Sequence, residues 1–157
     1  MRRNAWAAAV AVLVAVSAVG CSDDGDNGTD PPAGVTLADL AGTWDATEAE
    51  FQSLDNPLIR FDLVALGGSL TLTVAANGDY SATIQPPGEA PETETGTVTV
   101  QGNVIDLNVD GVPESVEFDF TLVGNTLTMV TESDEFDFDG DDVDDPARLT
   151  LVLVRRA

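Results

Sequence analysis

Apolar and polar residues alternate with a period of two along most of the chain beyond residue 34. Leu70, Leu72 and Val74 alternate with threonines, and the same alternation recurs at 116–122 and 149–153. Successive side chains of an extended chain point to opposite sides, so this period predicts β-strands with one buried face. Helical periodicity is almost absent, and only 36–40 predicts a capped helical turn.

The strand pattern predicts an all-β fold. Eight segments carry it, at 43–52, 68–75, 79–85, 94–100, 103–109, 115–122, 126–133 and 147–155. Most neighbours are separated by hairpin-length turns such as Asn77-Gly78 and Asp110-Gly111, and tight hairpins favour these residue pairs. The connections are too short for parallel crossovers, which leaves an antiparallel up-and-down meander. Eight such strands can close into a barrel. A two-sheet β-sandwich is the alternative.

The first 20 residues have the layout of a signal peptide. Two arginines precede an apolar run that is too short to span a bilayer comfortably. The run ends in Ala18-Val19-Gly20-Cys21, which resembles the lipobox of bacterial lipoproteins. The resemblance implies cleavage before Cys21, attachment of acyl chains such as palmitate to it, and anchoring in a lipid bilayer of the cell envelope. Ser22 then favours the outer membrane in a cell with two membranes. The alternative is an ordinary cleaved signal in which Cys21 is incidental.

Charge and composition divide the rest of the chain and exclude some partners. Residues 21–34 contain no large apolar side chain and predict a flexible acidic tether, with the folded domain at 35–157. The chain has 28 Asp+Glu, 6 Lys+Arg (all arginine) and no His, for a net charge of -22. Nucleic acid is excluded as a partner, because phosphate binding needs clustered basic side chains.

The first predicted strand of the domain resembles that of the lipocalin barrel. Gly42-Thr43-Trp44 carries the Gly-x-Trp signature of that family, and Arg155 and Arg156 follow the last strand. In lipocalins an arginine there packs across the tryptophan, so the resemblance implies this role for Arg155 or Arg156. It also implies that the protein binds a small apolar or amphipathic ligand. The alternative is a structural or surface lipoprotein whose barrel is filled by side chains.

The segment 53–67 is the longest connection between predicted strands, and it is unusually apolar. In lipocalins the first connection of this kind covers the mouth of the barrel, so the resemblance implies a lid here. The candidate ligand-binding residues are Leu58, Ile59, Arg60, Phe61, Leu63 and Leu66. Arg60 would orient a carboxylate head group. The alternative is that the segment forms a ninth strand or a short helix packed on the barrel wall.

The sequence predicts no enzymatic activity. Without His there is no imidazole base for a serine or cysteine nucleophile. The serines of the predicted domain lack the sharp strand-to-helix turn that activates such a nucleophile. A carboxylate-dependent hydrolase is the one enzymatic alternative that the many acids leave open.

The densest run of charge, 134–145, suggests a calcium site as the one cofactor. Asp137, Asp139, Asp141 and Asp145 alternate around Gly140, and Ca²⁺ accepts six to eight such oxygen ligands. The spacing resembles the calcium loops of FG-GAP repeats, which implies a structural ion. The alternative is a solvated acidic hairpin loop.

Overall fold

A computed structural model describes residues 34–141 and 143–157. The predicted signal peptide, Cys21 and nearly all of the predicted tether therefore lie outside the described residues, as does Asp142. One short helix and nine strands make up the structure. They are α1 (Leu37–Leu40), β1 (Gly42–Ser53), β2 (Arg60–Asp62), β3 (Ser69–Val74), β4 (Asp79–Gln85), β5 (Glu92–Gln101), β6 (Val104–Val109), β7 (Ser115–Val123), β8 (Thr126–Phe136) and β9 (Asp145–Arg155).

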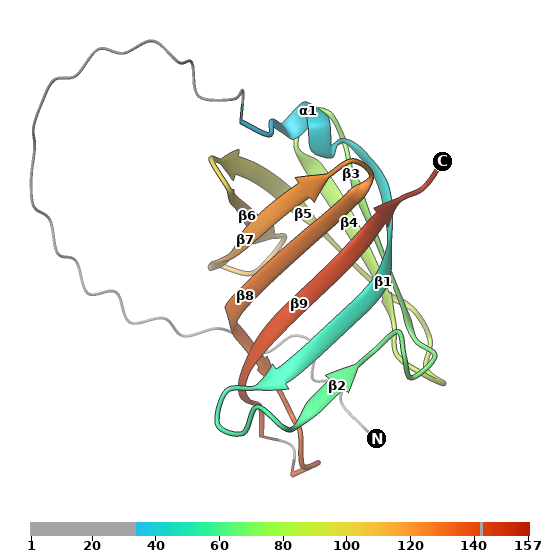
Figure 1. Cartoon of the computed structure of the whole chain (residues 1–157), viewed down its shortest axis with the longest axis vertical. Helices are drawn as coiled ribbons and strands as arrows, with labels where there is room; N and C mark the ends of the chain where they lie inside the picture. The colour runs from blue at the N-terminus through green and yellow to red at the C-terminus, as the bar shows by residue number, and fades with distance from the viewer. Residues whose placement is uncertain (1–33, 142) are drawn as a thin grey trace, which may run out of the picture.

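Eight of the strands form a closed antiparallel barrel (Figure 1). From β3 to β9 each strand pairs with the next one along the chain, and β1 pairs with both β3 and β9. The pairing of β1 with β9 closes the barrel, so neither strand is left as an open edge there. The predicted eight-stranded meander barrel is confirmed, and each of the eight predicted strands is present.

The segment 53–67 contains a ninth strand rather than a continuous loop. β2 pairs with residues 50–52 of β1, on the same side of β1 that pairs with β3 nearer its start. The ring of Phe61 lies 4.8 Å from that of Phe136, which ties β2 to the end of β8. The strand alternative for this segment is therefore confirmed.

Two β-bulges change which side chains of a strand point inward. In β1 the register with β9 shifts between Ala46 and Glu48, and in β8 it shifts between Thr131 and Asp134. Each shift adds one residue to the bulged strand. The inward-facing positions therefore change from even to odd numbers in β1 and from odd to even numbers in β8.

Side chains fill the barrel at the α1 end, where the Gly-x-Trp signature lies. Trp44 is fully buried, and its indole nitrogen donates a hydrogen bond to the Leu40 carbonyl (2.8 Å) at the end of α1. The guanidinium of Arg155 stacks over the indole, 4.1 Å from its centroid, and donates to the carbonyls of Ala41 and Asp39. Gly42 leaves room for this arginine, because a Cβ there would lie 2.7 Å from its Nη1.

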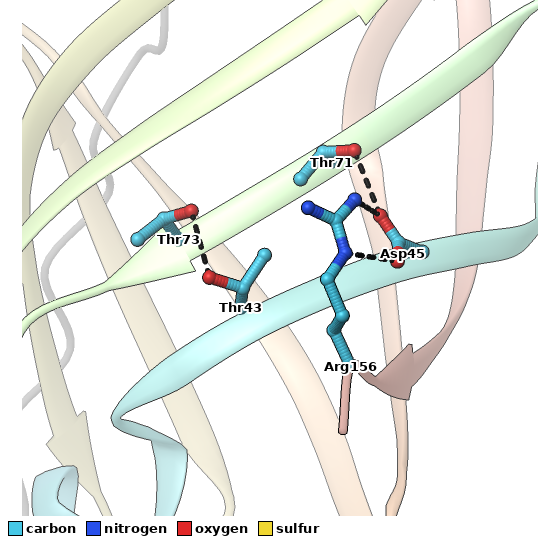
Figure 2. Close-up of polar contacts among 5 residues, drawn as sticks. All are labelled: Thr43, Asp45, Thr71, Thr73 and Arg156. Atoms are coloured by element: carbon cyan, nitrogen blue, oxygen red, sulfur yellow. Dashed lines mark hydrogen bonds and ion pairs between the residues drawn. The ribbon is translucent and has the colours of Figure 1, made fainter.

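Arg156 does not share this role. It lies on the outer face of the barrel, where it forms an ion pair with Asp45, whose carboxylate also accepts the Thr71 hydroxyl (2.9 Å; Figure 2). The hydrogen bond from Arg156 holds the pKa of the Asp45 carboxyl below its usual range. Of the two candidate arginines, Arg155 closes the barrel end and Arg156 links the chain terminus to its outer wall.

Candidate ligand-binding cavity

The opposite half of the barrel is hollow. A cavity of about 1040 Å³ lies between the strands, open toward the connections of β4 with β5, β6 with β7, and β8 with β9. Figure 1 shows the β8–β9 connection and α1 at opposite ends of the barrel. The deeper wall is apolar and consists mainly of Ala49, Phe51, Leu63, Leu70, Leu72, Ala82, Ile84, Leu107, Val116, Phe118, Met129, Leu149 and Leu151.

The mouth of the cavity is acidic. Eight carboxylate residues line it, namely Glu92, Glu94, Asp110, Glu114, Asp134, Glu135, Asp137 and Asp144. None of the four arginines in the described part of the chain lines the cavity. Arg60 and Arg148 pair with Glu50 and Glu132 on the outside of the barrel. Arg155 and Arg156 are engaged at the α1 end.

Glu94 projects inward from β5 near the mouth. It shares the inward face of that strand with Gly96 and Val98, and its Oε1 accepts the Tyr80 hydroxyl (3.3 Å). Gly96 is needed beside them, because a Cβ there would lie 2.9 Å from the Tyr80 ring and closer still to the backbone of Asn108. Burial raises the pKa of the Glu94 carboxyl, and the hydrogen bond from Tyr80 opposes this only in part. Burial and the neighbouring carboxylate also raise the pKa of Tyr80.

Asp134 enters the mouth from β8, just after the bulge. It lies opposite Ala147 of β9, and its Oδ1 accepts the backbone N–H of Glu135 (2.8 Å). Burial raises the pKa of this carboxyl from 3.8 to about 6, and the charges of Glu135, Glu94 and Asp144 add to the effect. Neighbouring negative charges thus disfavour the ionised form of Asp134.

The predicted ligand-binding residues are spread over different surroundings. Only Leu63 lines the cavity, where it is fully buried. Leu58 is 92% exposed, and Ile59 and Leu66 are also exposed. Arg60 bonds to Glu50 and to the Pro57 carbonyl outside the cavity. Phe61, the last of the set, is half-buried against Phe136, which itself lines the cavity wall.

Three of the four predicted calcium ligands lie together in the β8–β9 connection. Each of Asp137, Asp139 and Asp141 offers a carboxylate oxygen within 4.8 Å of the other two, and the last two side chains are exposed. Their carboxylates accept backbone N–H groups of the loop, including Gly140 N–H to Asp137 (2.6 Å). Asp145 is not in this group and pairs with Phe136 as the first residue of β9. The backbone hydrogen bonds shape the turn without requiring an ion.

Only Asp137 of the eight mouth acids was a predicted site residue, and Glu94 and Asp134 are two of those that the sequence analysis missed. Glu94 could have been found, because the alternation of β5 places it on the same face as Val98. Asp134 could not, because simple alternation from Leu127, Met129 and Thr131 puts it outside, and only the bulge turns it inward.

No protein-family model matches the chain, and a search of the curated proteins finds no significant match. In the described part of the chain, no helix is long and apolar enough to cross a membrane.

Proposed function

We propose that this protein is a lipocalin-like lipoprotein of the cell envelope that binds a small apolar or amphipathic molecule inside its barrel. The observation that carries the proposal is the cavity of about 1040 Å³ with an apolar wall. Binding sites for small molecules typically measure about 300–1,000 Å³ and are mostly apolar with a few polar groups. The anchoring part of the proposal rests on the Cys21 signal.

The alternative of a filled, purely structural barrel has less support. An eight-stranded barrel is just wide enough for side chains to fill or for one small ligand. Here the α1 end is packed by residues such as Trp44, Leu127 and Leu153, and none of these lines the cavity. Leu72, Ala82 and Met129 face the hollow half instead. A barrel with only a structural role has no need to keep this space open at the cost of packing.

In the hydrolase alternative, Glu94 and Asp134 would be the catalytic pair of carboxyl groups. Glycoside hydrolysis by two carboxyl groups needs one that holds its proton and one that stays ionised, so their surroundings push the two pKa values apart. At this mouth burial raises the pKa of both carboxyls. The apolar wall beneath also offers few partners for sugar hydroxyls. Ligand binding accounts for the arrangement better.

Calcium binding by the β8–β9 connection stays a prediction of the sequence. The grouping of Asp137, Asp139 and Asp141 is compatible with a shared ion. It is equally compatible with a solvated turn held by its backbone hydrogen bonds.

A dye that becomes fluorescent in apolar surroundings tests the binding function. The full chain carrying Cys21→Ala, purified without detergent, is titrated with the neutral dye N-phenyl-1-naphthylamine. We expect saturable fluorescence, and we expect Ala82→Phe to weaken it at least tenfold, because the added ring occupies the cavity. The control is Val123→Phe, since Val123 is 76% exposed at the end of β7. Absence of saturable binding, or equal binding by all three proteins, would contradict the proposal.

A further inference from the structure

The cavity joins two surfaces of opposite character. Its deeper wall is built from aliphatic and aromatic side chains such as Phe51, Leu107 and Phe118. Its mouth is lined by carboxylates from β5, from β8, from the β6–β7 connection and from both ends of the β8–β9 connection. A ligand that uses both surfaces has an apolar body and a polar end, and the mouth determines the charge of that end.

Every arginine of the described residues is engaged elsewhere. Arg60 bonds to Glu50, Arg148 to Glu132 and Arg156 to Asp45, all outside the barrel. Arg155 is held over Trp44 at the far end. A carboxylate or phosphate head group would therefore meet acids in the mouth and no cation from this part of the chain.

We propose that the ligand is a cationic amphiphile, with its apolar chain inside the barrel and an amine or quaternary ammonium group among the carboxylates of the mouth. This inference rests on the proposed binding function and specifies its ligand class. Glu94 and Asp134 are the two acids that we assign to the head group, because both line the cavity, Glu94 on the inward face of β5 with Val98 and Asp134 just after the bulge of β8.

The electrostatics of the mouth support this assignment. Burial makes the charged forms of Asp134 and Glu94 costly, and the charges of Glu135, Glu94 and Asp144 raise that cost further for Asp134. A cation among them would replace this repulsion by attraction in a partly desolvated site, where such interactions are stronger than in water. Without a cation there, the folded protein bears the free-energy cost of holding several partly buried carboxylates close to one another.

An inorganic cation or a neutral ligand uses less of the site. A metal ion would offset the charge of the mouth and leave the apolar cavity without an occupant. A neutral apolar molecule would fill the cavity and bring no positive charge to the acidic mouth. A cationic amphiphile satisfies both, which is why we assign this class.

Four probes separate these cases by displacement of N-phenyl-1-naphthylamine from the Cys21→Ala chain. Decylamine, 1-decanol and decanoate share one alkyl chain and differ in charge, while methylamine carries the charge without the chain. We expect decylamine to bind at least tenfold more tightly than 1-decanol, decanoate to bind more weakly still, and methylamine to displace no dye. Added salt should weaken decylamine binding and leave 1-decanol unchanged.

Two double variants show whether the mouth causes the preference. Glu94→Gln with Asp134→Asn should lower the affinity for decylamine at least tenfold and leave that for 1-decanol within twofold. The matched control is Glu117→Gln with Asp119→Asn, which removes the same charge from exposed positions on the outer face of β7 and should leave both affinities unchanged.

The outcomes separate the inference from the function on which it rests. If the dye binds but the three decyl probes bind equally, the binding function stands and the cationic preference is wrong. The preference is also wrong if methylamine competes as well as decylamine, or if both double variants weaken decylamine alike, because general surface charge would then explain the effect. If neither the dye nor any decyl probe binds, the binding function itself fails.

Discussion

Replacing Asp134 by asparagine should stabilise the protein at neutral pH, although it removes a residue of the proposed site. Asparagine has nearly the same shape, and its side-chain oxygen can still accept the backbone N–H of Glu135. What it removes is a half-buried charge. The pKa of this carboxyl is raised from 3.8 to about 6, chiefly by burial. Such a difference between unfolded and folded states costs about 3 kcal/mol of stability at pH 7.

The sign of the pH dependence follows from the direction of that change. The folded protein binds the Asp134 proton more tightly than the unfolded chain does. The stabilisation from this proton is therefore complete below about pH 4 and is lost as the pH rises through about 6. We expect Asp134→Asn to gain about 2–3 kcal/mol over the parent at pH 7 and about 0.5 kcal/mol at pH 4. The gain at pH 7 corresponds to a rise in Tm of roughly 6–12 °C.

Denaturation at a series of pH values between 4 and 7.5 measures this difference, for both proteins in the Cys21→Ala background. Because acids distant from Asp134 titrate equally in parent and variant, the difference between the two proteins reports Asp134 together with the acids that it interacts with. The control is Asp119→Asn, an exposed position on β7 that should change the free energy of unfolding by less than about 0.5 kcal/mol. A gain at pH 4 as large as that at pH 7, or no gain at either, would refute a buried carboxylate at this position.

Three further predictions concern other parts of the molecule. Trp44→Ala should cost about 3–5 kcal/mol of stability by urea denaturation, because a fully buried aromatic side chain is lost; a cost below about 1 kcal/mol would contradict its position. Cys21→Ala should move the protein from the membrane to the soluble or exported fraction on cell fractionation, and unchanged partitioning would refute lipidation. If the β8–β9 connection binds calcium, millimolar Ca²⁺ should raise Tm and Asp139→Asn with Asp141→Asn should abolish the rise. Identical melting curves in calcium and in chelator would contradict a calcium site and favour the solvated acidic loop.

Local pattern was enough to predict the strands and the barrel. Alternation such as that of 116–122 depends only on burial of one strand face, and the Gly-containing turns limit neighbours to antiparallel pairing. Trp44 and its arginine partner could be proposed from the family signature. Choosing Arg155 over Arg156 needed the structure, because adjacent residues of a strand point to opposite sides and the bulge in β1 changes the register.

The site was harder to predict because it depends on distant segments. The apolar run 58–66 suggested a lid, but pairing with β1 makes three of its residues a strand, and only Leu63 reaches the cavity. The acidic mouth combines residues from β5, β8 and two connections, and closure of the barrel brings them together. The cavity itself depends on how the side chains of all eight strands fill the interior. The sequence pattern of any one strand therefore does not predict it.

Native mass spectrometry of the Cys21→Ala chain, purified without detergent from its own host, tests the central claim most directly. The account predicts a bound small molecule that adds mass to the protein and is displaced by decylamine. It also predicts that Ala82→Phe, which fills the cavity, lacks this added mass, whereas Val123→Phe retains it. A parent chain that is found only at its own mass, both as purified and after incubation with decylamine, would contradict a ligand-binding barrel.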